Sequence, residues 1–224
     1  MIIMVNKFYT PILTVYMLHW IEEGPDAEFT VSQKALLRFL NHIERKNMIN
    51  LNDIDDIRTT SYQDAVMISF DDVTESFWTY AYPILKKRQI PFTLFVATDY
   101  INKEGFLSSE QLQQLSDDEL CTIGSHGISH QYFSCMSKET IIKELKESKV
   151  ILQQLTHREI KYFAFPYGAF FSCGYHFKHH VLDYYKAGFS TIPTYITKNP
   201  LIRPYFMPRI NLTEQLINKL CKNV

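Results

Sequence analysis

The sequence predicts an α/β fold in which crossover helices cover a parallel sheet, either open or closed into a barrel. Short runs rich in β-branched and aromatic residues alternate with helical stretches along the chain, a pattern typical of parallel strands joined by crossover helices. The chain has 224 residues, 46% of them hydrophobic, which is enough for one domain with a large core. Because no internal repeat, low-complexity tract or linker divides the sequence, we expect a single domain over residues 1–224.

The expected strands are short apolar runs that end at turn or polar residues. They lie at residues 12–19, 65–70, 91–97, 122–125, 162–165, 189–192 and 207–211. The expected helices show apolar residues at helical spacing, and they lie at residues 32–46, 75–88, 109–115, 138–155, 177–187 and 213–221. In either form of this fold, chemistry is expected at the carboxyl ends of the strands.

The longest expected helix shows the pattern on which these assignments rest. Ile141, Leu145 and Leu152 mark its apolar face, whereas Glu144 falls on its polar side. Residues that favour helix ends mark other boundaries. The expected N-caps are Ser32 and Thr213, and the expected C-terminal stop is Gly188.

Composition excludes several classes of protein. The formal net charge of -1 argues against a general nucleic-acid binder, which needs a basic field. The four cysteines lack a C-x-x-C spacing and are expected to be free thiols. Residues 1–20 are apolar but are interrupted by Asn6, Lys7 and Pro11. A signal peptide has basic residues before its apolar stretch, whereas the lone Lys7 follows five residues of this one. We therefore expect no transmembrane segment, no signal peptide and a cytoplasmic location.

Two adjacent carboxylates, Asp71 and Asp72, stand at the carboxyl end of the expected strand 65–70. Adjacent side chains diverge, so one can bind a metal while the other faces a substrate water molecule. The same pair also fits a solvated turn that caps a helix beginning near Thr74.

Two of the eight histidines, His126 and His130, follow the expected strand 122–125. A spacing of four lets both rings reach one ion when a turn or tight loop brings them to one side. Two histidines and one carboxylate leave coordination positions open, which is the pattern of a catalytic zinc site.

A third segment, Pro166-Tyr167-Gly168, ends the expected strand 162–165. Proline fixes the bend, and glycine lets the backbone approach a ligand. A backbone N–H at this place can face a developing oxyanion, although a plain strand-to-loop turn also fits.

Together these three segments resemble the motifs of the polysaccharide deacetylase (NodB-like, carbohydrate esterase family four) family. The motif T-F-D-D-G is similar to Ser69-Phe70-Asp71-Asp72-Val73. The motif H-[ST]-x-x-H is similar to His126-Gly127-Ile128-Ser129-His130, and R-x-P-Y-G is similar to Ala164-Phe165-Pro166-Tyr167-Gly168. Order and spacing agree over roughly residues 11–211, and the style of the third motif is closest to exopolysaccharide poly-N-acetylglucosamine deacetylases. The resemblance implies a distorted (β/α)7 barrel.

The resemblance also implies an activity, the hydrolysis of an N-acetyl group on a sugar in a glycan or a lipid-linked glycan intermediate. By position, Asp71 is the general base, and the metal ligands are Asp72, His126 and His130. Zinc is the favoured divalent ion for two histidines and a carboxylate, and nickel, cobalt or iron also fit. The Tyr167 backbone N–H is expected to stabilise the oxyanion. The expected substrate contacts are Pro166, Tyr167 and Trp20.

Three departures from the motifs lead to further expectations. Ala164 stands where the family has an arginine, so we expect Arg209 to hold Asp71 instead. His19 ends the first expected strand and is expected to act as the general acid or to bind substrate. Val73 stands where the family has glycine, and we expect it to forbid a positive φ after the two carboxylates.

Four alternatives remain open from the sequence. Residues 53–56 contain a D-x-D pattern that also occurs in glycosyltransferases. A second zinc site could form from Cys173, His176, His179 and His180. The same fold could also serve a deformylase or another C–N amidohydrolase, or a catalytically silent sugar-binding relative. The oligomeric state is not predicted.

Overall fold

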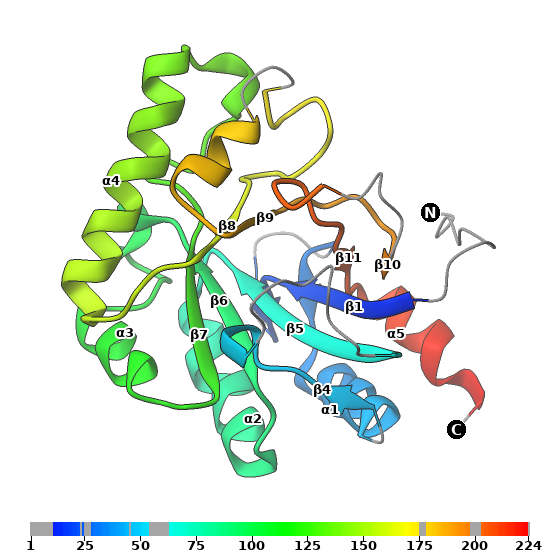
Figure 1. The fold of residues 1–224 in the computed structure, drawn as a ribbon. Coiled ribbons are helices and arrows are strands. Elements are labelled where there is room, and N and C mark those ends of the chain that lie inside the picture. Colours follow the sequence, from blue (N-terminus) through cyan, green and yellow to red (C-terminus); the bar gives the residue numbers. More distant parts are fainter. Residues whose placement is uncertain are drawn as a thin grey trace.

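A curled sheet forms the centre of the molecule, and helices lie around its outside (Figure 1). The computed structural model describes residues 11–22, 24, 28–44, 46–53, 63–174, 178–197 and 203–223. The sheet contains β1 (Pro11–Leu18), β4 (Asn47–Met48), β5 (Ala65–Asp71), β6 (Phe92–Val96), β7 (Cys121–Ser125), β8 (Tyr162–Ala164), β9 (Ala187–Phe189), β10 (Ile196–Thr197) and β11 (Ile210–Asn211). A separate pair consists of β2 (Trp20–Ile21) and β3 (Thr30–Val31).

The strand order predicts where a functional site can form. Along the sheet the order is β10-β1-β5-β6-β7-β8-β9, with β11 also paired to β1 and β4 to β5. From β1 through β9 the neighbouring strands on this path run parallel, whereas β10 runs antiparallel to β1. The carboxyl ends of β1, β5, β7 and β8 therefore lie at the same end of the sheet.

Residues 207–211 lie between the two edges of the parallel sheet. Met207 forms a parallel bridge with Phe189 of β9, and β11 pairs in parallel with β1. Pro208 has no N–H to donate to a ladder, so the expected strand 207–211 is reduced to a bridge followed by two residues. This arrangement confirms the expected distorted (β/α) barrel.

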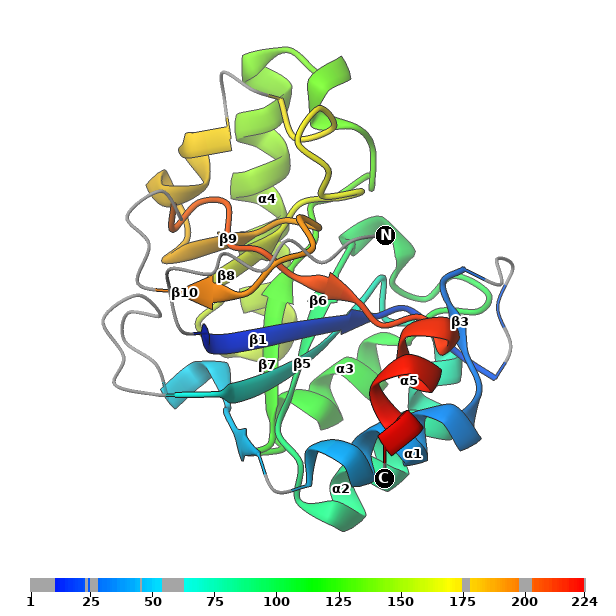
Figure 2. The same ribbon diagram turned by 90° about the vertical axis from the view of Figure 1, so that its right-hand side faces the viewer.

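The helices that cover the sheet are α1 (Gln33–Ile43), α2 (Tyr82–Arg88), α3 (Ser109–Ser116), α4 (Lys138–Thr156) and α5 (Glu214–Leu220). The expected N-caps are confirmed, because the side chains of Ser32 and Thr213 accept hydrogen bonds from the first turns of α1 and α5. Figure 2 shows α5 beside α1, and Arg38 of α1 donates a hydrogen bond to Asn218 of α5 at 2.7 Å.

The core lies on both sides of the sheet. Every residue of β5 is buried, as expected for a parallel strand covered on both faces. One apolar cluster fills the interior of the barrel and includes Leu13, Met67, Phe95 and Phe189. A larger cluster lies between the strands and the helices. Burial of each such side chain contributes about 1.5–3 kcal/mol to the free energy of folding. The two clusters together hold the strands, and therefore the strand ends that carry the site, in fixed positions.

The region around β9 differs from the sequence prediction. The expected helix 177–187 is a 3-10 helix at Lys178–Asp183, and Gly188 lies within β9 instead of stopping a helix. A Cβ on Gly188 would lie 2.8 Å from the carbonyl oxygen of Tyr205, so close backbone packing explains the glycine. The expected strand 189–192 is consequently shifted toward the N-terminus.

The expected helix 75–88 is interrupted by a wide turn. Residues Phe77–Ala81 form a π-helix, and α2 begins directly after it with Pro83 in its first turn. Proline cannot donate a backbone hydrogen bond, and its ring clashes with the preceding turn of a regular helix. The wider π turn accommodates this residue.

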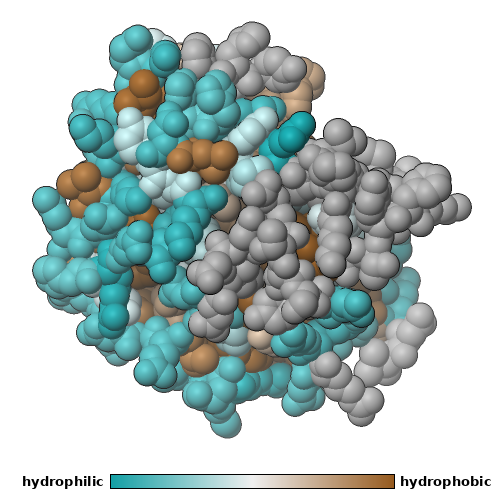
Figure 3. Space-filling model, in the orientation of Figure 1, coloured by the Kyte–Doolittle hydropathy of each residue, from teal (hydrophilic) through white to brown (hydrophobic). Residues whose placement is uncertain are grey.

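Apolar side chains on the face shown in Figure 3 stand in small groups among polar ones, outside the grey atoms. Within the described ranges, no helix combines the length and the apolar character needed to cross a bilayer. All four cysteines are free thiols, as expected.

Candidate active site

A cavity of about 380 Å³ opens at the carboxyl ends of β1 and β5. It is lined by Met17, His19, Trp20, Phe29, Asp71, Asp72, His126, His130, Tyr167, Thr191 and Asn211. This lining contains all the expected site residues except Arg209 and Pro166. Arg209 lies fully buried beside Asp71. Pro166 is buried and does not line the cavity, so its contact with a substrate stays a prediction.

Asp71 is held by Arg209, which is 138 residues away in the sequence. Arg209 Nη1 donates to Asp71 Oδ1 at 2.6 Å, and Nη2 donates to Oδ2 at 2.7 Å. Arg209 Nε donates to the backbone oxygen of Ser190 at 3.0 Å. Arg209 is 0% exposed and Asp71 is 2% exposed. This two-pronged pair fixes the orientation of the carboxylate, and it stands where the sequence analysis expected Arg209.

The charge of Asp71 depends on its partners. Burial alone would raise the pKa of Asp71, but the charges of Arg209 and His126, together with the hydrogen bonds from Arg209, bring it below the ordinary range. Asp71 is therefore an ionised carboxylate at neutral pH. It is a candidate proton acceptor whose position is fixed before a substrate arrives.

Asp72, His126 and His130 bring three ligand atoms together. These atoms lie within 4.8 Å of one another. Asp72 Oδ1 is 3.1 Å from His130 Nε2 and 3.7 Å from His126 Nε2. Among the described residues, no other group of His, Cys, Asp and Glu side chains converges in this way.

The surroundings of one oxygen atom of Asp72 show that these residues fit a metal ion. Asp72 Oδ1 is buried and has no hydrogen bond from any described residue, although the His130 ring lies close to it. Burial would raise the pKa of Asp72, but the contact with His130 and the charges of His126 and His130 lower it. An ionised oxygen without a donor beside two imidazole nitrogens is a donor set that suits zinc and similar divalent ions.

His126 is oriented for binding through Nε2. Its Nδ1 lies 2.7 Å from the backbone oxygen of Ala164, and a carbonyl can only accept, so Nδ1 carries the proton. Nε2 then presents its lone pair toward Asp72. Burial lowers the pKa of His126 to about 4, which keeps this ring neutral. A second hydrogen bond of this kind is typical of histidines that bind metals.

The backbone around the site adopts left-handed conformations that non-glycine residues rarely use. Values of φ are +61° for Asp72, +57° for Val73, +52° for His130 and +61° for Tyr167. The expectation that Val73 forbids a positive φ is therefore wrong. Such conformations cost about 1–3 kcal/mol each. Val73 is 2% exposed, so burial of its side chain offsets this cost.

Glu144 supports the loop between His126 and His130, a role that sequence reasoning missed. Its Oε2 accepts hydrogen bonds from the backbone N–H of Ile128 at 2.6 Å and of Ser129 at 3.2 Å. Its Oε1 accepts from the Ser129 hydroxyl at 2.7 Å. Glu144 is 5% exposed, so its placement on the polar side of α4 was wrong. A Cβ on Gly127 would lie 2.9 Å from Glu144 Oε2, so the glycine leaves room for this carboxylate, but a glycine in place of the Ser or Thr of the family motif does not by itself point to Glu144.

Replacement of Glu144 by alanine is expected to weaken metal binding about 10–100-fold, because the loop that carries His130 loses three hydrogen bonds. Glu144→Gln keeps an acceptor for the two N–H groups and is expected to retain most of the affinity. Zinc titration by calorimetry measures the difference. Glu147→Ala is the matched control, since Glu147 lies on the same helix with an exposed side chain. Unchanged zinc affinity in Glu144→Ala would show that the loop does not need this carboxylate.

Tyr167 offers an unused backbone donor to the cavity. Among the described residues, none accepts a hydrogen bond from its N–H, while its carbonyl accepts from Thr191 Oγ1 at 3.0 Å. Gly168 follows with φ +56°, and a Cβ there would lie 2.4 Å from Thr191. Glycine is thus required for the tight turn that presents this N–H.

His19 and Trp20 also line the cavity. The Nδ1 atom of His19 is buried without a hydrogen bond from any described residue, and its ring contacts Phe29 edge-on at 4.9 Å. Burial lowers the pKa of His19, so this imidazole is neutral at pH 7. Trp20 contacts Phe106 edge-on at 5.9 Å. The roles expected for both residues stay predictions.

The rival metal sites are only partly described. His176 and residues 54–56 lie outside the described residues. Cys173 is fully buried, and His180 Nδ1 lies 2.7 Å from Asp183 Oδ2. Cys173 is therefore part of the buried core, and His180 already has a protein partner in Asp183.

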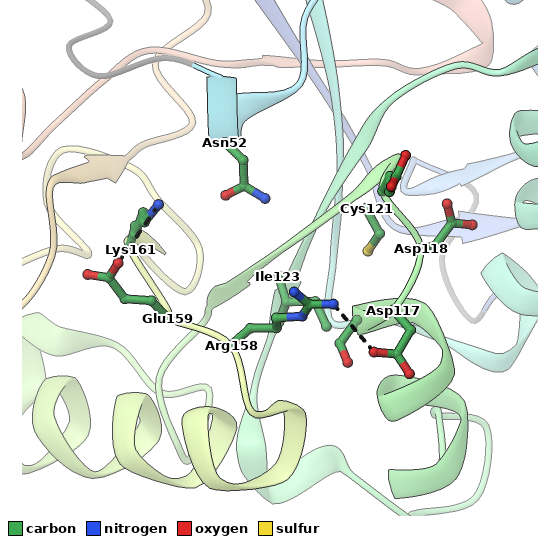
Figure 4. A pocket seen from close by; sticks show the side chains of 10 residues that line it. Asn52, Asp117, Asp118, Cys121, Ile123, Arg158, Glu159 and Lys161 are labelled. Atoms are coloured by element: carbon green, nitrogen blue, oxygen red, sulfur yellow. Dashed lines mark hydrogen bonds and ion pairs between the residues drawn. The ribbon is translucent and has the colours of Figure 1, made fainter.

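A second cavity, of about 270 Å³, lies at the amino ends of β7 and β8, opposite the first (Figure 4). Charged side chains of both signs line it. Arg158 pairs with Asp117 across it at 3.5 Å, and Asp118 accepts from Lys86 at 2.7 Å. Arg158, Asp117 and Asp118 thus have ion-pair partners. Such pairing is expected at the amino ends of barrel strands, where residues contribute to stability and not to catalysis.

Comparison with known proteins agrees with this site. The family model for polysaccharide deacetylase matches residues 58–180, more than half of the chain. A poly-beta-1,6-N-acetyl-D-glucosamine N-deacetylase of Staphylococcus aureus (strain MRSA252) is 32% identical in an alignment 173 residues long that covers 70% of this chain and 58% of that protein. The chain thus spans less than two thirds of that relative. The putative polysaccharide deacetylase YxkH of Bacillus subtilis (strain 168) is 27% identical over 47% of this chain and 37% of its own length.

Solved structures confirm the fold. IcaB from Ammonifex degensii superposes with a TM-score of 0.80 at 19% identity, over 95% of this chain and 96% of that one. A polysaccharide deacetylase from Bacillus cereus gives a TM-score of 0.81 at 20% identity, over 96% of this chain and 70% of that one. By the family match and the motifs that line its cavity, the chain belongs to the polysaccharide deacetylase family.

Proposed function

We propose that this protein hydrolyses the N-acetyl group of a sugar in a glycan or a lipid-linked glycan intermediate, with the help of a divalent metal ion. The observation that carries the proposal is the convergence of Asp72, His126 and His130 beside the ionised Asp71 in one cavity. Family membership supports it, as does the similarity to the Staphylococcus aureus relative, which is named an N-deacetylase of poly-beta-1,6-N-acetyl-D-glucosamine.

Asp72, His126 and His130 would hold the ion, which supplies Lewis acidity toward an amide carbonyl oxygen and lowers the pKa of a nearby water molecule. Zinc suits two imidazole nitrogens and one carboxylate oxygen, and nickel, cobalt or iron are the alternatives. The three side chains come from two loops that follow parallel strands. Because all three side chains line the cavity, an ion that they hold would face the space where a substrate binds.

Asp71 acts as the proton acceptor for the attacking water molecule. Asp71 Oδ2 lies 3.8 Å from His126 Nε2, so the carboxylate borders the proposed ion site directly. Arg209 keeps this carboxylate ionised and fixes its direction. The free Tyr167 N–H donates to the oxyanion that develops on the amide carbonyl. His19 lines the same cavity, and we propose that it contacts the leaving amine or the sugar.

Removal of the metal tests the proposal. We expect purified protein to contain, or to bind, about one equivalent of zinc. We also expect it to release acetate from N-acetylglucosamine oligomers or lipid-linked N-acetylated sugars. Chelation should abolish the release, and added zinc should restore it. Acetate detection after dialysis against chelator, with metal analysis of the same samples, measures both effects.

Two variants control this experiment. Asp72→Asn should lose both zinc and acetate release, because a charged ligand is replaced by a neutral amide. Asp117→Asn, at the far end of the barrel, should keep both. Protein that binds no divalent ion would end the proposal. Release of formate from a formylated sugar, without acetate release, would indicate a different acyl group. The cytoplasmic location, the single-domain organisation and the oligomeric state stay predictions.

A further inference from the structure

We propose that Tyr132 and Tyr167 form a binding site for the sugar unit next to the one that loses its acyl group. We call this pair the tyrosine platform. The inference rests on the proposed function and deepens it, because it names the side chains that would bind the neighbouring sugar unit of the glycan.

The two rings of the tyrosine platform are stacked on each other, and one of them borders the cavity. Their centroids are 3.8 Å apart, and their planes differ by 13°. Tyr167 lines the cavity, whereas Tyr132 does not. On the inner side, the His130 ring lies 4.9 Å from the Tyr167 ring. The rings therefore form a row that leads from a proposed metal ligand out of the cavity.

Both rings of the platform remain accessible to a ligand. Tyr132 is 45% exposed and Tyr167 is 46% exposed. No described residue forms a hydrogen bond with either hydroxyl group. The exposed stacked pair thus presents apolar ring surface together with two free polar groups beside the cavity. This combination matches a sugar ring, which has an apolar C–H face and a rim of hydroxyl groups.

The backbone holds the platform in place. Tyr167 has φ +61°, and its turn is fixed by Thr191, which donates to the Tyr167 carbonyl through Oγ1 and to the Gly168 carbonyl through its N–H at 2.8 Å. On the other side, Phe133 is 1% exposed and anchors the chain directly after Tyr132. Rings held by an ordered backbone lose little conformational entropy when a ligand binds.

The size of the cavity indicates where a second sugar unit must lie. A volume of about 380 Å³ is near the lower end of the range for sites that take one small ligand. A neighbouring unit of a glycan chain therefore extends beyond the cavity. Tyr132 lies directly outside the lining, because its ring is stacked on the lining residue Tyr167.

Chain-length dependence tests the tyrosine platform. Acetate release is measured with N-acetylglucosamine and with its β-linked tetramer, on zinc-loaded wild type and on Tyr132→Ala. We expect Tyr132→Ala to raise KM for the tetramer about tenfold with little change in kcat, because one stacking surface is lost. The loss of kcat/KM on the monosaccharide is expected to be much smaller.

Three control variants separate stacking from structural effects. Tyr132→Phe keeps the stacked ring but loses one hydroxyl group, so its KM for the tetramer should lie between those of wild type and Tyr132→Ala. Tyr132→Leu keeps bulk without an aromatic face and should behave like Tyr132→Ala. Phe171→Ala removes an aromatic side chain that is 86% exposed and is expected to change neither substrate. Equal losses on monosaccharide and tetramer, or no loss on the tetramer, would overturn the platform.

A binding experiment distinguishes failure of the platform from failure of the proposed function. Calorimetric titration with the tetramer compares wild type with Tyr132→Ala and does not depend on hydrolysis. Tetramer binding that weakens about tenfold in Tyr132→Ala supports the platform even if wild type releases no acetate. Tetramer binding of equal strength in both proteins, or in neither, refutes the platform whatever the hydrolytic activity.

Discussion

Replacement of Arg209 by alanine is expected to lower the free energy of unfolding by about 3–5 kcal/mol, because it leaves a buried carboxylate without its partner. Asp71 is 2% exposed and receives two hydrogen bonds from this guanidinium. Acetate release is expected to fall about 100-fold, since Asp71 also loses its fixed direction. Urea denaturation and acetate release, each measured across pH, test both effects.

The pH dependence of this variant has a definite sign. In the wild type the pKa of Asp71 is lowered, so the Arg209 pair stabilises the fold above the ordinary carboxyl pKa. This stabilisation is lost as the pH falls through the lowered pKa of the folded state. Without Arg209, burial dominates and raises the pKa of Asp71. The acid side of the rate profile should therefore move to higher pH.

Two further variants complete the test of Arg209. Arg209→Lys keeps the charge but not the two-pronged geometry, so it should lose less stability and part of the activity. It also keeps the test valid if Arg209→Ala does not fold. Arg158→Ala, which breaks the exposed pair with Asp117, should cost no more than about 1 kcal/mol. An Arg209→Ala protein with the rate and pH profile of wild type would contradict the positioning role.

Replacement of Asp71 by asparagine is expected to reduce acetate release by about 100- to 10,000-fold while zinc remains bound. Asparagine has a similar shape, but its amide cannot take the proton of the attacking water molecule. Asp72, His126 and His130 are unchanged, so the zinc stoichiometry should stay that of wild type. Metal analysis and acetate release on the same preparation measure the two properties separately.

The control for this prediction is Asp99→Asn, which changes an exposed carboxylate near the site and should keep full activity. Loss of zinc together with activity in Asp71→Asn would make Asp71 a metal ligand instead of a base. Unchanged activity would remove it from the mechanism. Because Arg209 loses its buried counter-charge, the assays should be run well below the melting temperature of the variant.

Most of the barrel could be predicted because its signals are local. The apolar run at residues 65–70 is β5, and the periodic residues of 138–155 are α4. Predictions failed where contacts distant in sequence decide the backbone. Gly188 is required by the nearby Tyr205 carbonyl, not by a helix end. Pro83 is accommodated by a π turn that no periodicity indicates.

The candidate site divides in the same way. Asp71, Asp72, His126 and His130 could be found from motifs, since each follows a strand whose end is predictable. Val73 contradicted its motif, because burial of its side chain offsets a left-handed conformation. The role of Glu144 could not be predicted, because its position in the helical pattern of α4 indicates an exposed side chain. In the structure its carboxylate accepts hydrogen bonds from a loop that precedes α4 in the chain.

The sequence by itself determined the order of strands and helices and the motif residues at the strand ends, because these depend on local patterns of side chains. The partner of Asp71 was also expected from the sequence, because Arg209 lies on the last predicted strand. Only the tertiary structure decided the other supporting contacts: packing of α4 brings Glu144 to the histidine loop, and two loops stack Tyr132 on Tyr167. Each of these contacts joins segments that are distant in the sequence and close in space. No local pattern of side chains predicts which distant segments the fold brings together.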